Sequence, residues 1–289
     1  MTSHLEVLAT GPLTLVQDAG RPGLAAVGVG RSGAADRGAF RLGARLVGQS
    51  YDGAALEVTL GGLSVRARGA ALVALTGAEA PALLDGRPVG YRAPVQLRDG
   101  QTLTLGTPAT GLRTYLAVRG GVAVPATLGS RSTDTLAGLG PPAVRVGDLL
   151  PVGPPPPRFP DTDLAPGEPP SGDTLLLRAL PGPRADWLAD PAALAGTGWT
   201  VSERSDRVGL RLTGTPLAYA ESRHGQELSS EGVVRGAVQV PAGGQPVLFL
   251  ADHPVTGGYP VVAVLTARDA DRAAQARPGQ GVRLQYVPA

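Results

Sequence analysis

The hydrophobic residues of the first half of the chain fall into short runs, apolar or alternating, with turn-forming residues between them. Such runs are typical of β-strands. Gly-Gly or Asp-Gly pairs stand at 61–62, 85–86, 99–100 and 120–121, and pairs of this kind favour tight turns. The pattern predicts strands at 13–17, 56–60, 72–76, 95–98, 102–105 and 115–118.

One segment of this half has a helical period. Apolar residues recur at 39, 40, 43, 46 and 47, which places them on one face of a helix. Asp36 stands just before them, where a short polar side chain caps a helix start. We expect a helix here that plugs or covers one end of a barrel.

The second half repeats this style. Its apolar runs predict strands at 175–180, 199–202, 209–212, 233–240, 247–250, 261–265 and 282–287. Residues 183–195 have room for one or two short helices, and a further helix is expected from a cap at Asp269 through Ala276. The chain is therefore predicted to be mainly β, with two barrel-like lobes and a few short helices.

Prolines concentrate between 151 and 172, with four in succession at 154–157. Such a run joins neither a helix nor a sheet and favours an extended connector. We predict an N-terminal subdomain at 1–153, a proline-rich linker or loop at 154–172 and a C-terminal subdomain at 173–289. A surface loop within one domain is the alternative.

The composition excludes several kinds of chemistry. The chain has no cysteine and no lysine, so all 26 basic residues are arginine. Disulfides, thiolate metal sites, Schiff bases and a P-loop lysine are therefore excluded. The three histidines, His4, His224 and His253, are too scattered to indicate a metal site.

Charge and hydropathy narrow the possible partners. A net charge of +2 without a stripe of arginines does not indicate nucleic acid. The N-terminal residues lack a basic region followed by an apolar stretch, and no apolar run approaches the ~18 residues of a membrane span. We expect a cytoplasmic protein with no membrane partner.

Two polar, glycine-containing loops precede the predicted helix. In the loop at 17–23, Arg21 is suited to bind a carboxylate or phosphate, or else Asp18 and Arg21 pair with each other and hold a turn. In the loop at 30–36, Ser32, Gly33 and the amides of a helix start are suited to an anion. Simple capping of the helix by Asp36 is the alternative.

Further polar groups lie later in the chain. Arg131 stands among hydroxyl residues, Ser132 included, in a segment that fits an anion site or a self-satisfied turn. If the strand at 199–202 continues, Ser202, Arg204 and Asp206 share one face of it. The remaining candidates of this group are Arg207, Glu231, Gln239, Asp252, Gly257, Gly258 and Tyr259.

Several motifs, in this order along nearly the whole chain, resemble one family. They are LVQDAGRPGLAAVGVGRSGAADRGAFRLGARLVG at 15–48, ALEVTLGG at 55–62, YLAVRGG at 115–121, GSRSTD at 129–134, SERSDRVGLRL at 202–212, GAVQVPAGGQPVLFLAD at 236–252 and TGGYP at 256–260. They are similar to the biotin-dependent carboxyltransferase family, also called the allophanate hydrolase subunit 2 family. That family includes KipA-like proteins and the C subunit of 5-oxoprolinase.

The resemblance implies a cyclophilin-like β-barrel architecture and work in a complex. The implied partners are a KipI-like B subunit and a LamB/YcsF-type A subunit. The implied activity is the ATP-dependent opening of 5-oxo-L-proline to L-glutamate, with Mg²⁺, by a chain that is inactive alone. The alternatives are a non-catalytic regulator that binds a KipI-like kinase inhibitor, and a carboxyltransferase half that acts with biotin on urea or a related amide.

The resemblance and the residues together give a set of expected site residues. We expect catalytic roles for Asp18, Arg204 and Asp252. The residues expected to bind substrate or phosphate are Arg21, Ser32, Gly33, Arg131, Ser132, Arg207, Glu231, Gln239, Gly257, Gly258 and Tyr259. No resident metal is expected on this chain.

Overall fold

The structure is a computed structural model that describes residues 3–167 and 169–288. Its chain divides into two compact units. The N-terminal unit contains the residues up to Arg21, then 32–134 and 138–170, and the C-terminal unit contains 22–31, 135–137 and the residues from Ser171 onward.

The described strands of the N-terminal unit form two antiparallel sheets. The six-stranded sheet has the order β11-β1-β4-β9-β6-β7, and the five-stranded sheet has the order β2-β3-β10-β5-β8. The bounds are β1 (His4–Thr10), β2 (Leu13–Gln17), β3 (Ala55–Thr59), β4 (Leu63–Arg68), β5 (Ala71–Gly77), β6 (Ala82–Leu84), β7 (Arg87–Pro88), β8 (Pro94–Leu97), β9 (Thr102–Leu105), β10 (Arg113–Val118) and β11 (Leu149–Pro151).

Alternation along the strands produces the core of this unit. In β4, Leu63, Val65 and Ala67 are buried while the residues between them are partly exposed, as expected for a strand with one face toward a core. These side chains join one apolar cluster with buried residues from both sheets, such as Leu56 and Leu75. The two sheets therefore share a single core.

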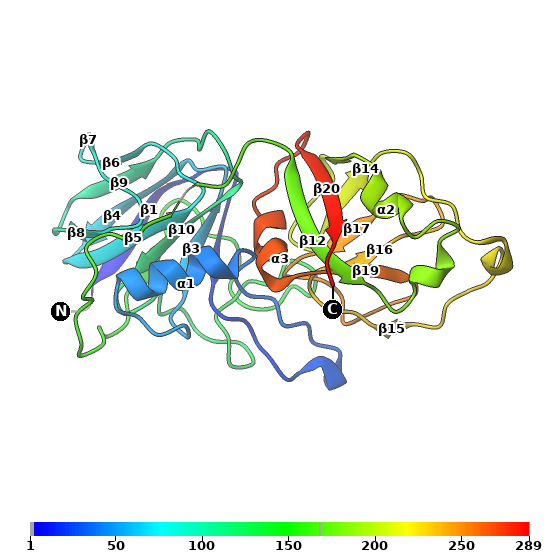
Figure 1. The fold of residues 1–289 in the computed structure, drawn as a ribbon. Helices are drawn as coiled ribbons and strands as arrows, with labels where there is room; N and C mark the ends of the chain where they lie inside the picture. The colour runs from blue at the N-terminus through cyan, green and yellow to red at the C-terminus, as the bar shows by residue number, and fades with distance from the viewer. Residues whose placement is uncertain (1–2, 168, 289) are drawn as a thin grey trace. The chain divides into compact units, whose positions relative to one another are not determined.

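Helix α1 (Arg37–Leu46) covers the other face of the five-stranded sheet (Figure 1). Phe40 packs there against Tyr115, with ring centroids 6.4 Å apart. Gly43 permits the close approach, since a Cβ there would lie 3.1 Å from the Cβ of Ala117. Every residue of β10 is buried because the strand is covered on both faces. The helix therefore lies across a sheet, whereas the sequence had predicted it at the end of a barrel.

Seven described strands of the C-terminal unit close a barrel in the order β12-β19-β16-β17-β14-β13-β20. The first and last strands in sequence, β12 and β20, pair in parallel. The bounds are β12 (Leu175–Pro181), β13 (Trp199–Val201), β14 (Gly209–Thr213), β16 (Ala237–Gln239), β17 (Val247–Phe249), β19 (Val261–Leu265) and β20 (Gly281–Tyr286), with a separate ribbon of β15 (Glu231–Gly232) and β18 (Thr256–Gly257).

The helical turns of this unit are short. They are α2 (Ala193–Gly196), α3 (Ala267–Ala273) and three-residue 3-10 helices at Ala25–Val27, Ala185–Trp187 and Glu221–Arg223. The cap of α3 differs from the predicted one: Thr266 accepts a hydrogen bond from the amide of Asp269, and the Asp269 carboxylate accepts one from the Thr266 hydroxyl. Asp269 therefore lies inside the first turn.

The expectation of a mainly β chain with few helices is confirmed. The second lobe is a closed barrel, while the described strands of the first lobe form two packed sheets. The predicted strand at 233–240 is interrupted, because residues 233–236 turn between β15 and β16.

The proline-rich segment lies with the N-terminal unit as far as Pro170. Arg119 holds this segment in place. Its guanidinium donates hydrogen bonds to the carbonyl oxygens of Val47 (3.0 Å), Arg158 (2.7 Å) and Pro156. Its Cζ lies 4.9 Å from the centroid of the Phe159 ring. The segment is thus held as a loop by hydrogen bonds and a cation–π contact. Nothing in the local pattern indicated that residues 22–31 and 135–137 group with the second unit.

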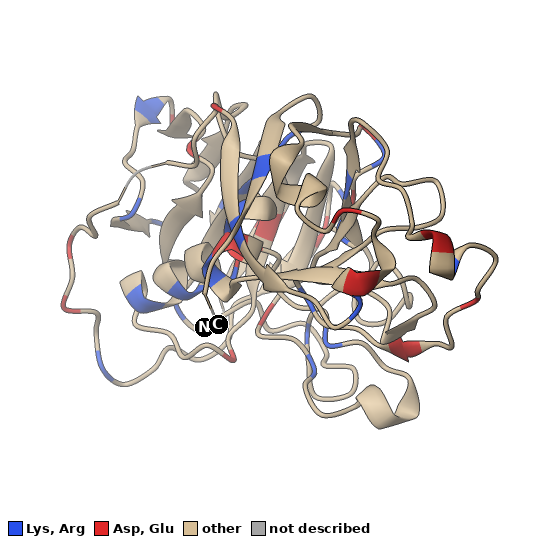
Figure 2. Ribbon diagram, turned by 45° about the vertical axis from the view of Figure 1, so that its right-hand side comes forward, with Lys and Arg blue, Asp and Glu red and all other residues tan. Residues whose placement is uncertain are grey.

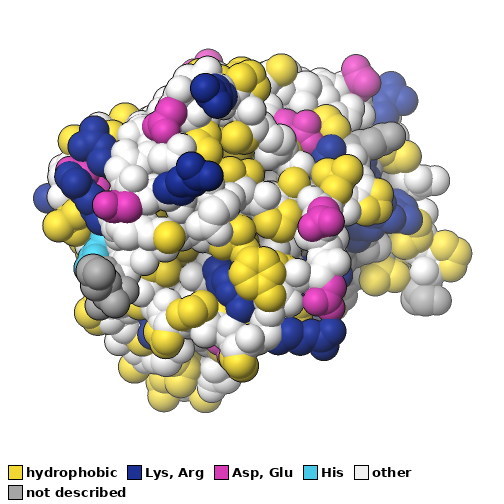
Figure 3. All heavy atoms as spheres, turned by 90° about the vertical axis from the view of Figure 1, so that its left-hand side faces the viewer, with side chains coloured by type: hydrophobic (Ala, Val, Ile, Leu, Met, Phe, Trp, Pro, Cys, Tyr) yellow, Lys and Arg dark blue, Asp and Glu magenta, His cyan; other side chains and the backbone are white. Residues whose placement is uncertain are grey.

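In the view of Figure 2, charged residues of both signs are distributed along the described parts of both units. On the face of the N-terminal unit shown in Figure 3, hydrophobic side chains are scattered among arginine and acidic side chains. Within residues 3–167 and 169–288, no helix is long and apolar enough to cross a membrane.

Candidate functional site

Three segments of the N-terminal unit meet around Asp18, at the end of β2. Its Oδ1 accepts hydrogen bonds from the hydroxyls of Ser130 (2.6 Å) and Ser132 (2.5 Å) and from the amide of Gly20 (2.8 Å). Its Oδ2 accepts one from the amide of Arg131 (2.6 Å). A carboxylate that is 4% exposed and accepts four hydrogen bonds is well suited to holding the loop at 129–134 in place.

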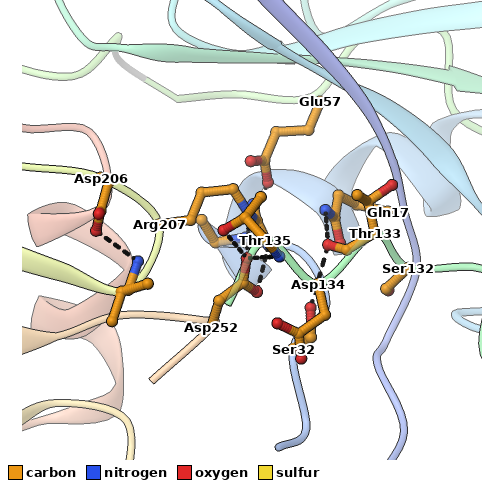
Figure 4. Close-up of polar contacts among 12 residues, drawn as sticks. Gln17, Ser32, Glu57, Ser132, Thr133, Asp134, Thr135, Asp206, Arg207 and Asp252 are labelled. Carbon is orange, nitrogen blue, oxygen red and sulfur yellow. Dashed lines mark hydrogen bonds and ion pairs between the residues drawn. The ribbon is translucent and has the colours of Figure 1, made fainter. Parts of the chain in front are cut away.

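Ser32 and Gly33 lie against the same loops. Ser32 is fully buried at φ 53°, and its hydroxyl donates to the Thr133 carbonyl, which also accepts from Gln17 (Figure 4). Gly33 has φ 93°, and a Cβ there would lie 2.9 Å from the amide nitrogen of Gly20. The glycine therefore permits a close approach of two backbone segments.

The amides before and at the start of α1 have acceptors within the protein. The amide of Ala34 donates to the Asp18 carbonyl (3.0 Å), that of Ala35 to Glu57 Oε2 (2.9 Å) and that of Asp36 to the Tyr115 hydroxyl (2.8 Å). The Asp36 carboxylate accepts from the amide of Ala39, so the predicted N-cap is confirmed. These bonds occupy the donors that an anion would require.

Arg21 is 1% exposed and lies beside the loop at 129–134. Its Nη2 donates to the Ser132 carbonyl, and its Nη1 lies 3.9 Å from Asp134 Oδ2. Among the described residues, its Nε and Nη1 have no hydrogen-bond partner. The expected pairing of Asp18 with Arg21 is not the arrangement found, because both side chains bind the loop instead.

Arg131 differs from Arg21 in that it lines a cavity. Its Nε donates to the Val124 carbonyl (2.8 Å), and its amide is the one that Asp18 binds. The cavity has a volume of about 200 Å³. Its lining also includes Gln49, Ser50 and Asp52, which the sequence analysis did not single out. Of the predicted site residues, Arg131 is the one that lies in a described cavity of the N-terminal unit.

The backbones around this cavity approach closely. A Cβ on Gly120 would lie 2.1 Å from the Gly153 carbonyl oxygen, and one on Gly153 would lie 2.4 Å from that of Gly120. The amide of Gly120 donates to Gln49 Oε1 (2.9 Å), which fixes the segment after α1. Glycine is required here because two chain segments touch through their main chains.

In the C-terminal unit, Arg207 and Asp252 form a buried bidentate pair. The Nε–Oδ2 and Nη2–Oδ1 distances are 2.9 and 3.0 Å, and both residues are at most 3% exposed. Asp252 Oδ2 also accepts from the amide (2.9 Å) and hydroxyl (2.8 Å) of Thr135 (Figure 4). The structure thus brings these two predicted residues together as partners of each other.

Arg204 lies on an exposed turn and not on a strand face. Strand β13 ends at Val201, and the amide of Ser205 donates to the Ser202 carbonyl in the turn that follows. The Asp206 carboxylate accepts from the amides of Val208 and Gly209. The predicted alternation of Ser202, Arg204 and Asp206 on one strand face is therefore wrong, because the backbone turns there.

The last predicted group gathers at the ribbon of β15 and β18. Glu231 pairs with Gly257 across the ribbon and forms an ion pair with Arg184. Hydrogen bonds from Arg184 lower the pKa of Glu231. Gln239 donates to the Tyr259 carbonyl (2.9 Å), and Gly258 lies next to Tyr259, which is 52% exposed. The structure thus brings these residues together at the ribbon.

A buried polar network at the start of α1 was missed by the sequence analysis. Glu57 is 1% exposed and accepts from the Tyr115 hydroxyl (2.7 Å), and its Oε1 lies 3.5 Å from Arg113 Nε. The signal was present, since Glu57 is a single charge within an apolar strand run. Among the described residues, no group of three or more His, Asp or Glu side chains is arranged to hold a metal ion.

The fold places this chain in a class of mainly β proteins with two units, one built of two packed sheets and the other a closed barrel. Segments of the chain alternate between the two units. The model of one family, described as "Carboxyltransferase domain, subdomain A and B", matches residues 27–286. The chain belongs to this carboxyltransferase domain family.

Three relatives illustrate the range of the family. The chain is 39% identical to the C subunit of 5-oxoprolinase from Escherichia coli, over 97% of this chain and 90% of that protein. It is 31% identical to urea amidolyase of Saccharomyces cerevisiae, over 98% of this chain and 16% of the relative. The crystal structure of Kluyveromyces lactis urea amidolyase superposes with a TM-score of 0.92 at 28% identity, over 99% of this chain and 19% of that one. The chain thus spans less than a fifth of these urea amidolyases.

Proposed function

We propose that this chain is a subunit of an ATP-dependent 5-oxoprolinase and helps to open 5-oxo-L-proline to L-glutamate. The observation that supports this most is the similarity to the C subunit of 5-oxoprolinase, which covers nearly the whole of both chains. In urea amidolyase the same fold is a small part of a longer chain. The identity to the C subunit of 5-oxoprolinase, 39%, also exceeds the 31% to the Saccharomyces cerevisiae urea amidolyase, which favours the oxoprolinase.

The reaction needs activation because a lactam is a poor electrophile with a poor leaving group. In the proposed reaction, ATP transfers its γ-phosphoryl group to the lactam oxygen and ADP leaves. Water attacks the ring carbon, the C–N bond breaks and the nitrogen takes up a proton. A second water releases phosphate, so one 5-oxo-L-proline, one ATP and two waters give one glutamate, one ADP and one phosphate. Arginine side chains and amides stabilise negative charge that develops on such oxygens.

The candidate arginines differ in how far their side chains are already bound within the protein. Arg207 already has Asp252 as a bidentate partner, and Arg21 is buried beside the Ser132 carbonyl. Arg131 lines a cavity, so we assign to it the first contact with a substrate carboxylate. A cavity of about 200 Å³ is below the ~300–1,000 Å³ of larger ligand sites. We therefore place no ATP in it, and a nucleotide with its Mg²⁺ is proposed for the assembled complex as a whole.

The proposed partners are a KipI-like B subunit and a LamB/YcsF-type A subunit. A division of labour among the three is consistent with a chain whose candidate catalytic carboxylates, Asp18 and Asp252, are occupied by internal hydrogen bonds. This chain then contributes substrate binding, and we expect no turnover from it alone.

A second candidate function is biotin-dependent carboxyl transfer to urea or a related amide. Its support is the family itself and the TM-score of 0.92 to a urea amidolyase. In that case biotin carried by another protein would be the carboxyl donor. A regulatory role, in which the chain only binds a KipI-like protein, remains the third outcome of the test.

The test is glutamate formation from 5-oxo-L-proline, ATP and Mg²⁺ by this chain, by pairs of subunits and by all three. The proposal predicts glutamate from the complete set alone. Carboxylation of urea with a carboxylated biotin carrier, without glutamate formation, would favour the second function. A stable complex with the KipI-like B subunit that has neither activity would favour the regulatory one.

A further inference from the structure

The cavity beside Arg131 has the size of a small metabolite. Its volume of about 200 Å³ corresponds to about seven water molecules, since each water occupies ~30 Å³ of the liquid. A molecule of fewer than about ten non-hydrogen atoms fits such a volume. This is the size of a five-membered lactam with one carboxylate, and far below that of a nucleotide or of biotin with its side chain.

Arg131, which lines this cavity, is fixed at two points. Asp18 holds its amide, and the Val124 carbonyl holds its Nε. No hydrogen bond or ion pair within residues 3–167 and 169–288 uses its Nη1 or Nη2. A guanidinium that is held at Nε and open at its terminal nitrogens is prepared to bind a carboxylate.

Asp52 and Ser50 line the same cavity. Among the described residues, Asp52 forms no ion pair with Arg131, so the two opposite charges are more than 4.0 Å apart. A carboxylate accepts hydrogen bonds only, and a serine hydroxyl both donates and accepts. The cavity therefore offers a cation for a carboxylate and, separately, acceptors for an N–H group.

The walls hold this arrangement before any ligand binds. The segment that carries Ser50 and Asp52 is fixed by the bond between Gln49 Oε1 and the amide of Gly120. Two other lining residues are joined by the bond from the amide of Gly153 to the Gly121 carbonyl (3.0 Å). A site whose groups are held in place loses less entropy on binding.

We propose that this cavity binds a small carboxylate that also carries an amide N–H, with the carboxylate at Arg131 and the N–H at Asp52. The inference rests on the proposed function for its choice of ligand, 5-oxo-L-proline. It places the site within the N-terminal unit of this chain, so binding requires neither ATP nor a partner protein.

The test is calorimetric titration of the full chain with three ligands. These are 5-oxo-L-proline, 2-pyrrolidinone, which lacks the carboxylate, and N-methyl-5-oxo-L-proline, which lacks the N–H. We expect each change to the ligand to weaken binding about tenfold or more, equal to ~1.4 kcal/mol. Arg131→Gln should weaken the binding of 5-oxo-L-proline to a similar extent. This variant should bind 5-oxo-L-proline and 2-pyrrolidinone with equal affinity. Asp52→Ala should bind 5-oxo-L-proline and its N-methyl derivative with equal affinity.

The control is Arg98→Gln, which removes the same charge from an exposed position outside the cavity lining. It should bind all three ligands like the unmodified chain. Absence of saturable binding to the full chain, or unchanged discrimination by Arg131→Gln, overturns the inference.

The experiments distinguish an error in the proposed binding site from an error in the proposed function. Glutamate formation by the complete complex at an unchanged rate with Arg131→Gln, together with unchanged binding, overturns the cavity and leaves the function. If the chain binds the three ligands with the expected differences in affinity but the complete complex forms no glutamate, the binding site is supported and the oxoprolinase function is contradicted.

Discussion

Single carboxylates in this chain have their roles set by distant residues. Asp18 was a candidate catalytic group in a glycine-rich loop, yet its partners Ser130 and Ser132 lie 112 and 114 positions away. Residue type and spacing indicated that the polar loops matter, and the structure brings three of them together. The identity of the partners was not predictable, because such pairs depend on how the sheets pack and not on local sequence.

Asp18→Asn tests the structural role of this carboxylate. The amide removes the charge and places a donor where hydroxyl and amide donors converge, so we expect a loss of about 2–3 kcal/mol in the free energy of unfolding. Asp99→Asn is the matched control, because its carboxylate accepts one exposed bond from the amide of Gly69. Urea denaturation measures both; equal stabilities of the two variants would contradict this account.

Arg207→Gln and Arg204→Gln separate a structural arginine from an exposed one. Removing Arg207 leaves Asp252 buried without its bidentate partner, and we expect a loss of ~3–5 kcal/mol of stability. Arg204 lies on an exposed turn, so its variant should change stability by less than about 0.5 kcal/mol. Thermal unfolding of the two variants measures both changes in stability. A loss of complex activity in Arg204→Gln at unchanged stability would support the catalytic role predicted for Arg204.

At the scale of elements, the sequence predicted the long, strongly patterned segments and missed others. Helix α1 and most barrel strands were predicted from apolar periodicity and turn residues. Strands β1 and β4 were not, although HLEVLAT and LSVRAR alternate and the signal was therefore available. Strands β7 and β18 span two residues each, so they carry no period, and only pairing with a neighbour defines them.

The attachment of α1 to its sheet depends on the Tyr115 hydroxyl, which joins the amide of Asp36 to Glu57. Tyr115→Phe should lower the free energy of unfolding at pH 7 by about 1–3 kcal/mol, because a buried acceptor and a buried donor each lose a partner. Tyr51→Phe, at a 43% exposed position, is the control and should have little effect. Chemical denaturation of both variants checks this.

The same residue predicts an alkaline dependence. Burial, followed by the nearby Glu57 carboxylate, raises the pKa of Tyr115 well above its ordinary value of 10.0. Above pH 10 the unfolded chain releases this proton while the folded chain keeps it, so stability falls as pH rises, by up to about 1.4 kcal/mol per pH unit. Between pH 10 and 11 the stability of Tyr115→Phe should fall less steeply than that of the unmodified chain. Parallel slopes would show that Tyr115 does not contribute.

At the scale of the whole chain, the segments that make up each unit were not predictable from the sequence. The prolines predicted a linker or loop at 154–172, whereas residues 138–170 group with the N-terminal unit and the residues from Ser171 onward with the C-terminal unit. Residues 135–137 nevertheless group with the C-terminal unit, where Thr135 donates twice to Asp252. No local pattern reveals this, because it depends on a contact 117 positions away.

A fragment of residues 171–289 should therefore be less stable than the same region in the full chain. Without Thr135, Asp252 Oδ2 loses two donors, which we expect to cost about 2 kcal/mol or more. Hydrogen exchange of the barrel strands compares the fragment with the full chain, and addition of fragment 1–170 should restore protection. Equal protection in the isolated fragment would contradict the role given to this segment.

The central claim is that this chain is a necessary component of a 5-oxoprolinase. The most direct measurement is the yield of glutamate and ADP from 5-oxo-L-proline and ATP with Mg²⁺, by the complete set of subunits and by the same set without this chain. We predict glutamate and ADP in equal amounts from the complete set and no glutamate when this chain is omitted. Glutamate at an undiminished rate without it, or none from the complete and assembled set, would contradict the account.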